Sequence, residues 1–462
     1  MSSSYFLAIL LILASLSYMQ GKRRAFSLSG GKGVPRKLHS RPGYYGMLTA
    51  VWCVLPALTI FGFWVLFSDT IFTALALKTL PSSMQNLPAE QTNLLVNNLH
   101  TLVAGHVAAR DIDPVMQQAA LQYQGLERIG RSALGVVMFS LALLSASLVY
   151  RRIRPEMRAR NHVERIVQTG LIVCSTIAIL TTIGIVLSVL FESIRFFQHV
   201  PLTDFIFGMK WSPQMAMRAD QAGSSGSFGA VPVLAGTFMI SGIALTVAVP
   251  IGLMSAIYLS EYASGRVRAW AKPIMEILAG VPTVVYGFFA ALVVAPFIRG
   301  SGEFLGLNVS SESALAAGLV MGIMIIPFVS SLSDDVINAV PQAMRDGSYG
   351  LGATKSETIL NVILPAALPG IVGGGLLAAS RAIGETMIVV MAAGLSANLT
   401  ANPLQAVTTV TVQIVTLLVG DQEFDSPKTL VAFALGLLLF IVTLVLNVIA
   451  LYVVRKYREE YE

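Results

Sequence analysis

The chain has 462 residues, of which 55% are hydrophobic and only 12% are charged, and its formal net charge is +6. An average soluble domain carries about 25% charged residues, so the composition excludes a soluble globular protein and indicates an integral membrane chain. The basic excess lies in loops between apolar runs, and we therefore do not interpret it as a surface for nucleic acid.

Nine apolar runs are candidates for membrane-spanning helices, each of which needs about 20 residues. They lie near residues 5–20, 45–67, 131–150, 166–191, 230–260, 274–298, 314–333, 366–394 and 428–454. The first and seventh are the shortest, so the count is nine or differs by one. The first run could also be the apolar part of a secretory signal peptide. Because no basic residue precedes it and Lys22, Arg23 and Arg24 follow it, we interpret it as an anchor with its N-terminus outside.

The orientation of these spans follows from lysine and arginine, which favour the cytoplasmic side in short loops. Both 21–44 and 151–165 are rich in basic residues, so we predict that both are cytoplasmic. Alternation then places 261–273, 334–365 and the C-terminal tail inside, and 68–130, 192–229, 299–313 and 395–427 outside. The sequence thus predicts a multi-pass protein with an external N-terminus and a cytoplasmic C-terminus.

Two regions of different character follow one another along the chain. Residues 1–160 contain three spans around the polar external segment 68–130, whereas six spans with short connections lie beyond residue 160. His100 and His106 in the external segment have no acidic residue or second histidine pair beside them, so we predict no metal site.

The loop "YGLGATKSETILNVILPAALPGI", residues 349–371, separates two apolar runs. It contains part of a phosphate-binding pattern, but Thr354 stands where that pattern requires glycine and no strand precedes it. We therefore reject nucleotide binding at this loop. Because the chain also has no Ser-His-Asp arrangement or His-x-x-x-His pair, we predict a non-catalytic chain with no cofactor of its own.

The same loop resembles the EAA motif of ABC importer permeases. Gly352, Leu364 and Pro365 match it, Asp346 and Val362 match conservatively, and Gly347 and Ser348 replace its two alanines. In that family the loop forms a coupling helix that docks into a separate ATPase subunit, which binds ATP and Mg. The resemblance assigns this coupling to Asp346, Gly347, Ser348, Gly352, Leu364 and Pro365. Prolines 365 and 369 suit the first turn of the returning helix.

Longer phrases narrow the resemblance to the PstC-type permease of bacterial phosphate importers, over residues 165–455. They are "SFGAVPVLAGTFMISGIALTVAVPIGLMSAIYLSEYASGRVR", "ILAGVPTVVYGFF", "DGSYGLGATKSETILNVILPAALPGIVGG" and "SRAIGETMIVV". The resemblance implies an all-α integral membrane fold, the type-I ABC importer transmembrane domain with a six-helix core, to which residues 1–160 add a three-helix extension. That extension is either an additional anchor with an external cap or a docking site for a further partner.

The resemblance also implies partners and a place in the cell. These are a PstA-type permease, a dimer of PstB-type ATPases and a periplasmic phosphate-binding protein of the PstS type, assembled at the bacterial inner membrane.

Arg381 and Glu385 lie near the middle of the eighth predicted span, where each charge costs about 2.5–3.5 kcal/mol. At positions i and i+4 they are expected to share one helix face, while Gly370, Gly374, Ala378 and Ala382 form a second face of small residues for close helix packing. We predict that Arg381 contacts the anionic solute and that Glu385 holds Arg381 between cycles. A structural ion pair is the alternative. Thr283, Tyr286 and Thr386 are candidate hydroxyl donors along the path, or bonds between helices.

The function that the sequence predicts is inward transport of inorganic phosphate, driven by ATP that a partner hydrolyses. A permease for phosphonate, sulfate or molybdate is one alternative. A channel or secondary transporter is another, and both the EAA-like loop and the expected absence of paired, interrupted helices speak against it.

Overall fold

The computed structural model describes residues 3–29, 38–78, 95–97, 99, 101–103, 114–215, 225–419 and 426–458. The chain divides into two compact units, Met1–Leu180 and Thr181–Glu462, and each is described by itself. Within the described residues nine helices are long and apolar enough to cross a membrane, and each overlaps one of the nine predicted runs. The domain boundaries predicted at 160 and 165 stay a prediction. His100 and His106 lie outside the described residues.

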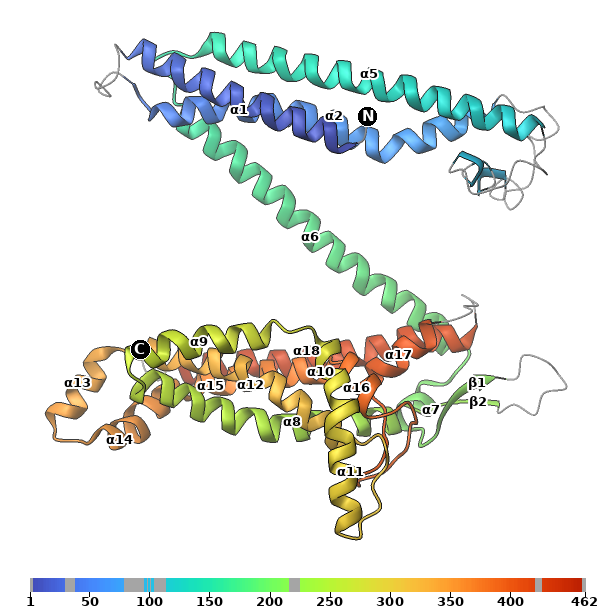
Figure 1. Cartoon of the computed structure of the whole chain (residues 1–462), viewed down its shortest axis with the longest axis vertical. Helices are drawn as coiled ribbons and strands as arrows, with labels where there is room; N and C mark the ends of the chain where they lie inside the picture. Colours follow the sequence, from blue (N-terminus) through green and yellow to red (C-terminus); the bar gives the residue numbers. More distant parts are fainter. Residues whose placement is uncertain are drawn as a thin grey trace. The chain divides into compact units, whose positions relative to one another are not determined.

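The first unit is built on three helices that pack side by side, α1 (Ser3–Leu28), α2 (Pro42–Leu77) and α5 (Pro114–Arg152) (Figure 1). The buried Thr49 hydroxyl of α2 donates a hydrogen bond to the Ser17 carbonyl of α1 over 2.9 Å. Helices α2 and α5 both extend beyond the predicted apolar runs into the segment 68–130, whose external location stays a prediction. The start of α5 is rich in glutamine, alanine and leucine, which favour helix even where no apolar run is present.

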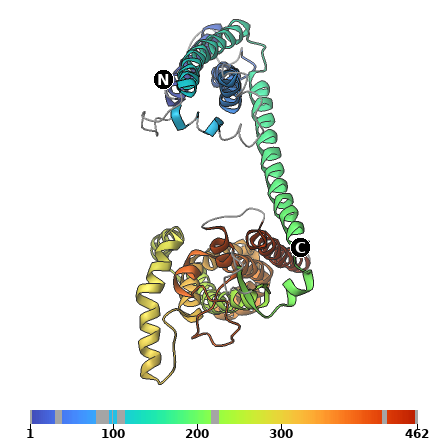
Figure 2. The same ribbon diagram turned by 90° about the vertical axis from the view of Figure 1, so that its right-hand side faces the viewer.

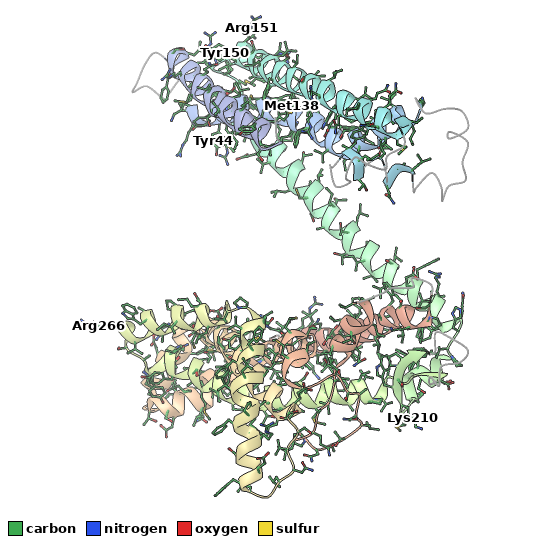
Figure 3. The ribbon with its side chains drawn as sticks, turned by 45° about the vertical axis from the view of Figure 1, so that its right-hand side comes forward. Tyr44, Met138, Tyr150, Arg151, Lys210 and Arg266 are labelled. Atoms are coloured by element: carbon green, nitrogen blue, oxygen red, sulfur yellow. The ribbon has the colours of Figure 1, made fainter. Side chains whose placement is uncertain are left out.

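Helix α6 (Ala159–Phe197) leads from the first unit into the second. No residue in its most apolar stretch is buried against other parts of the chain. After it come α7 (Leu202–Phe207) and an antiparallel hairpin of β1 (Trp211–Met215) and β2 (Ser225–Phe228). Trp211 lies opposite Phe228, and its indole N–H donates to Gln413 over 2.8 Å. Figure 3 shows Lys210 at the hairpin end of the second unit and Arg266 at the opposite end.

The second unit is a helical bundle whose central pair is α8 (Val231–Ile257) and α12 (Ala314–Ala339), joined by α15 (Leu364–Ile383) and α18 (Pro427–Arg458) (Figures 1 and 2). Ile240 and Ile325 are fully buried in its core. Gly370 permits the close approach of α15 to α12, because a Cβ there would lie 2.4 Å from Val336. The predicted packing face of small residues is thus confirmed at this position.

Two of the predicted spans are not continuous helices. The run 274–298 is divided into α9 (Gly265–Ala279) and α10 (Thr283–Phe289), which continues through the π-helical turn η3 (Ala290–Val294) into α11 (Ala295–Phe304). The break falls at 280–282 because Pro282 disfavours helical geometry at the residue before it. Helix α11 projects away from the bundle in both Figure 1 and Figure 2.

The second break divides the run 366–394. Helix α15 ends at Ile383, α16 (Met387–Ala392) follows, and an irregular segment leads to α17 (Val410–Leu418). The expected absence of paired, interrupted helices is therefore wrong, and it no longer distinguishes this chain from a secondary transporter.

Candidate functional site

The EAA-like segment folds into a small helical element at one end of the bundle, which we call the handle, residues 342–358. It comprises α13 (Gln342–Gly350) and α14 (Lys355–Thr358), after which the π-helical turn η4 (Ile359–Ile363) leads into α15 (Figure 1). No residue of α13 is buried, and Leu351 just beyond it is 92% exposed. The handle therefore offers an exposed surface beyond the packed ends of the spans.

A glycine ends α13. Gly352 has φ +86°, a left-handed conformation that glycine adopts without strain. Its N–H donates to the Tyr349 carbonyl over 2.9 Å, and the Ala353 N–H donates to the Ser348 carbonyl over 3.2 Å. These two bonds form a Schellman motif, the usual end of a helix at a left-handed glycine. Gly352 thus sets the angle between the two helices of the handle.

Other predicted coupling residues have separate places in the handle. Asp346 is exposed and accepts a hydrogen bond from Gln342 over 3.0 Å, and the hydroxyls of Ser348 and Thr358 lie 2.9 Å apart. A Cβ at Gly347 would meet nothing within 4 Å, so this glycine leaves space on the outer surface.

Thr354 and Glu357 form a capping box that starts α14. Leu364 and Pro365 begin α15, as predicted for the returning helix. Pro369 lies inside α15 rather than in its first turn, so its predicted place is wrong.

Arg381 and Glu385 do not share a helix face, because α15 ends between them at Ile383; that expectation was wrong. The Arg381 side chain is exposed within this chain, and its guanidinium carbon lies 5.4 Å from the ring centroid of Phe328 on α12. The Glu385 carboxylate accepts the backbone N–H of Met387 over 2.9 Å and so caps α16. Among the described residues, no ion pair joins Arg381 to Glu385.

The three candidate hydroxyls flank the two breaks. Tyr286 donates to the Leu278 carbonyl over 2.9 Å and so joins α10 to the end of α9. Thr283 is the first residue of α10, and Thr386 precedes α16. Helices α10 and α16 pack together, with Gly287 against Met391. The structure thus brings the two segments that follow the breaks into contact.

A charge cluster between α9 and α12 escaped the sequence analysis. The Asp334 carboxylate, 5% exposed, accepts two hydrogen bonds from Arg268 and one from Lys272, all at 3.0 Å. The hydrogen bond to Asp334 raises the pKa of Lys272. Asp334 is more than 60 residues from Arg268 and from Lys272 in the sequence. The sequence near Asp334 therefore showed only an aspartate at the end of an apolar run. The cluster lines a cavity of about 200 Å³ with Phe328 in its wall.

Both parts of the chain match known families. Residues 7–181 match a family model described as "Phosphate ATP-binding cassette transporter", and residues 248–459 match one described as "Binding-protein-dependent transport system inner membrane component". The "Probable ABC transporter permease protein YqgH" of Bacillus subtilis is 30% identical over 275 residues, which are 58% of this chain and 84% of the relative. The "Phosphate transport system permease protein PstC" of Mesorhizobium japonicum is 33% identical over 247 residues, 50% of this chain and 74% of the relative.

The chain belongs to the PstC-type family of ABC permeases. This PstC-type chain is a multi-pass inner-membrane protein with the transmembrane fold of type-I importers. A solved bacterial alginate ABC transporter, in complex with a periplasmic protein that holds an alginate pentasaccharide, is 16% identical at a TM-score of 0.43. The match covers 65% of this chain and 99% of the other.

Proposed function

We propose that this chain is the permease subunit of an ATP-driven importer that moves inorganic phosphate across the bacterial inner membrane. The observation that carries the proposal is the match to permeases named for phosphate transport. The family model that matches residues 7–181 also has phosphate in its description. This match supports the same solute class.

The energy comes from a separate ATPase dimer of the PstB type, which binds ATP and Mg and docks on the handle. In support, the handle is exposed and its angle is set by a Schellman motif, so a partner meets a preformed surface. The further partners are a PstA-type permease and a PstS-type binding protein.

Arg381 is the proposed solute contact. Phosphate carries between one and two negative charges near neutral pH, and a guanidinium offers several fixed donors to such an anion. Arg381 stacks on Phe328 and has no carboxylate partner among the described residues, so its N–H donors are available. Glu385 acts instead through the cap that it forms on α16. Thr283, Tyr286 and Thr386 supply hydroxyls to the same path.

Reconstitution in liposomes with the ATPase, the second permease and the binding protein tests the solute. Labelled phosphate is expected to accumulate with ATP, and excess sulfate, molybdate or phosphonate is expected to leave its uptake unchanged. Uptake of sulfate at the rate of phosphate would assign the chain to another oxyanion. Accumulation without the ATPase would assign it to the class of secondary transporters.

Paired substitutions test Arg381. We expect Arg381→Gln to reduce uptake about ten- to a hundredfold with ATPase binding intact, because a hydrogen bond to a charged group contributes about 1.5–3 kcal/mol. If Arg381 and Glu385 were a structural pair, Arg381→Gln/Glu385→Gln would restore uptake, since no unpaired charge would remain. The observed separation of the two side chains predicts no rescue. Arg299→Gln, which removes an exposed charge on α11, is the matched control.

A further inference from the structure

Two contacts hold the handle on the end of α8. This end is the π-helical turn η2 (Tyr258–Tyr262). Arg345 of α13 forms an ion pair with Glu261 of η2, and Lys355 of α14 places its ammonium 5.1 Å from the ring centroid of Tyr262. Both helices of the handle therefore contact adjacent residues of η2. We call these four residues the clamp.

The ion pair of the clamp is largely shielded from solvent. Only 12% of the Arg345 side chain and 5% of the Glu261 side chain are exposed. Arg345 also donates to the Ile337 carbonyl in the last turn of α12 over 2.7 Å. A buried ion pair seldom stabilises a fold more than apolar packing does, and π-helical turns occur frequently at functional sites. Both observations favour a role in transport over a role in stability alone.

The turn η2, which contains Glu261 and Tyr262, is continuous with the long helix α8. Residues Val231–Tyr262 form one span of 32 residues, which is about 48 Å at 1.5 Å per residue. At its other end the Thr237 hydroxyl accepts the N–H of Val410 over 3.0 Å. The neighbouring Thr411 hydroxyl donates to the Glu385 carbonyl over 2.8 Å. The span that carries the clamp thus reaches the break that follows Arg381.

We propose that Arg345 and Glu261 are positioning residues that couple movement of the handle to α8. When the ATPase displaces the handle, the clamp makes α8 move with it, and the contacts at Thr237 carry the displacement to the break after α15. The proposal rests on the proposed function, because it requires an ATPase docked on the handle. It assigns to the clamp a role in coupling, with no contact to the solute.

The ratio of phosphate imported to ATP hydrolysed tests the clamp in the reconstituted complex. We expect Glu261→Gln to lower this ratio about fivefold, a typical size for a coupling residue, while ATP hydrolysis continues. The exchange Glu261→Arg/Arg345→Glu is expected to restore much of the ratio because it restores the pair. The control is Arg299→Gln, which breaks an exposed ion pair on α11 outside the clamp. We expect it to keep the wild-type ratio of phosphate imported to ATP hydrolysed. An unchanged ratio in Glu261→Gln would overturn the proposal.

Two further measurements keep the outcome decisive. Where Glu261→Gln does not assemble, Glu261→Gln/Arg345→Gln replaces it, since it removes the ion pair without leaving an unpaired charge. An unchanged ratio in this double variant overturns the proposal equally. A distance between spin labels at Ser356 and Met254, both exposed, needs no phosphate. The clamp predicts one narrow distance with and without ATP, and a broad distribution in Glu261→Gln. If the wild type imports no phosphate but shows these distances, only the proposed function fails.

Discussion

Replacing Gly352 by alanine isolates the role of the handle's geometry. Gly352 has φ +86°, and a Cβ at this position would meet nothing within 4 Å. Crowding inside the chain therefore does not contribute, and the effect is conformational. The left-handed conformation costs a residue with a Cβ about 1–2 kcal/mol. This corresponds to a decrease of up to about 5- to 30-fold in the population of the observed handle.

Gly350 provides the matched control. It lies two residues earlier, at the end of α13, in an ordinary helical conformation, and a Cβ there also meets nothing within 4 Å. Alanine at Gly350 is expected to be neutral or to favour the helix, because alanine has the higher helix propensity. Asparagine at Gly352 should give an intermediate loss, since asparagine tolerates the left-handed region better than alanine does.

The assay is titration of purified ATPase onto the permease complex in detergent. We expect the apparent affinity to fall by up to the factor above for Gly352→Ala and to stay at the wild-type value for Gly350→Ala. Equal affinities for the two variants would refute the reasoning. A much larger loss for Gly352→Phe than for Gly352→Ala would show crowding by the ATPase itself, because the chain leaves this space open.

Three further predictions follow from other parts of the chain. In a cysteine-free background, a cysteine at Gln118 should react with an impermeant reagent in intact cells and one at Arg158 should not; the opposite pattern would reverse the predicted topology. Gly236→Ala should lower the free energy of unfolding by about 1–3 kcal/mol, seen as a lower melting temperature of the complex, because a Cβ there would lie 2.1 Å from the Thr408 carbonyl oxygen. Gly242→Ala in the same helix has open space around the new Cβ and should leave the melting temperature unchanged. Phe328→Leu should reduce phosphate uptake about two- to fivefold, as expected for loss of an exposed cation–π contact; normal uptake would show that the stacked guanidinium needs no support from the ring.

The sequence by itself determined the membrane class, the number of spans and the place of the handle. These features are local. Each span shows as an apolar run whose length matches the bilayer, and the handle shows as a glycine-containing segment between two such runs. The match of Gly352 to the EAA motif was also visible in the sequence, whereas its left-handed backbone conformation was not.

Only the tertiary structure decided how the charged residues are paired. The sequence places Arg381 and Glu385 four residues apart, but α15 stops at Ile383, so Arg381 stacks on Phe328 and Glu385 caps α16. Apolar composition continues across this break, and composition alone therefore does not reveal it. The pair of Arg345 with Glu261 joins residues 84 positions apart. Such contacts depend on which helices pack together, and that is decided by the close fit of side chains across the bundle.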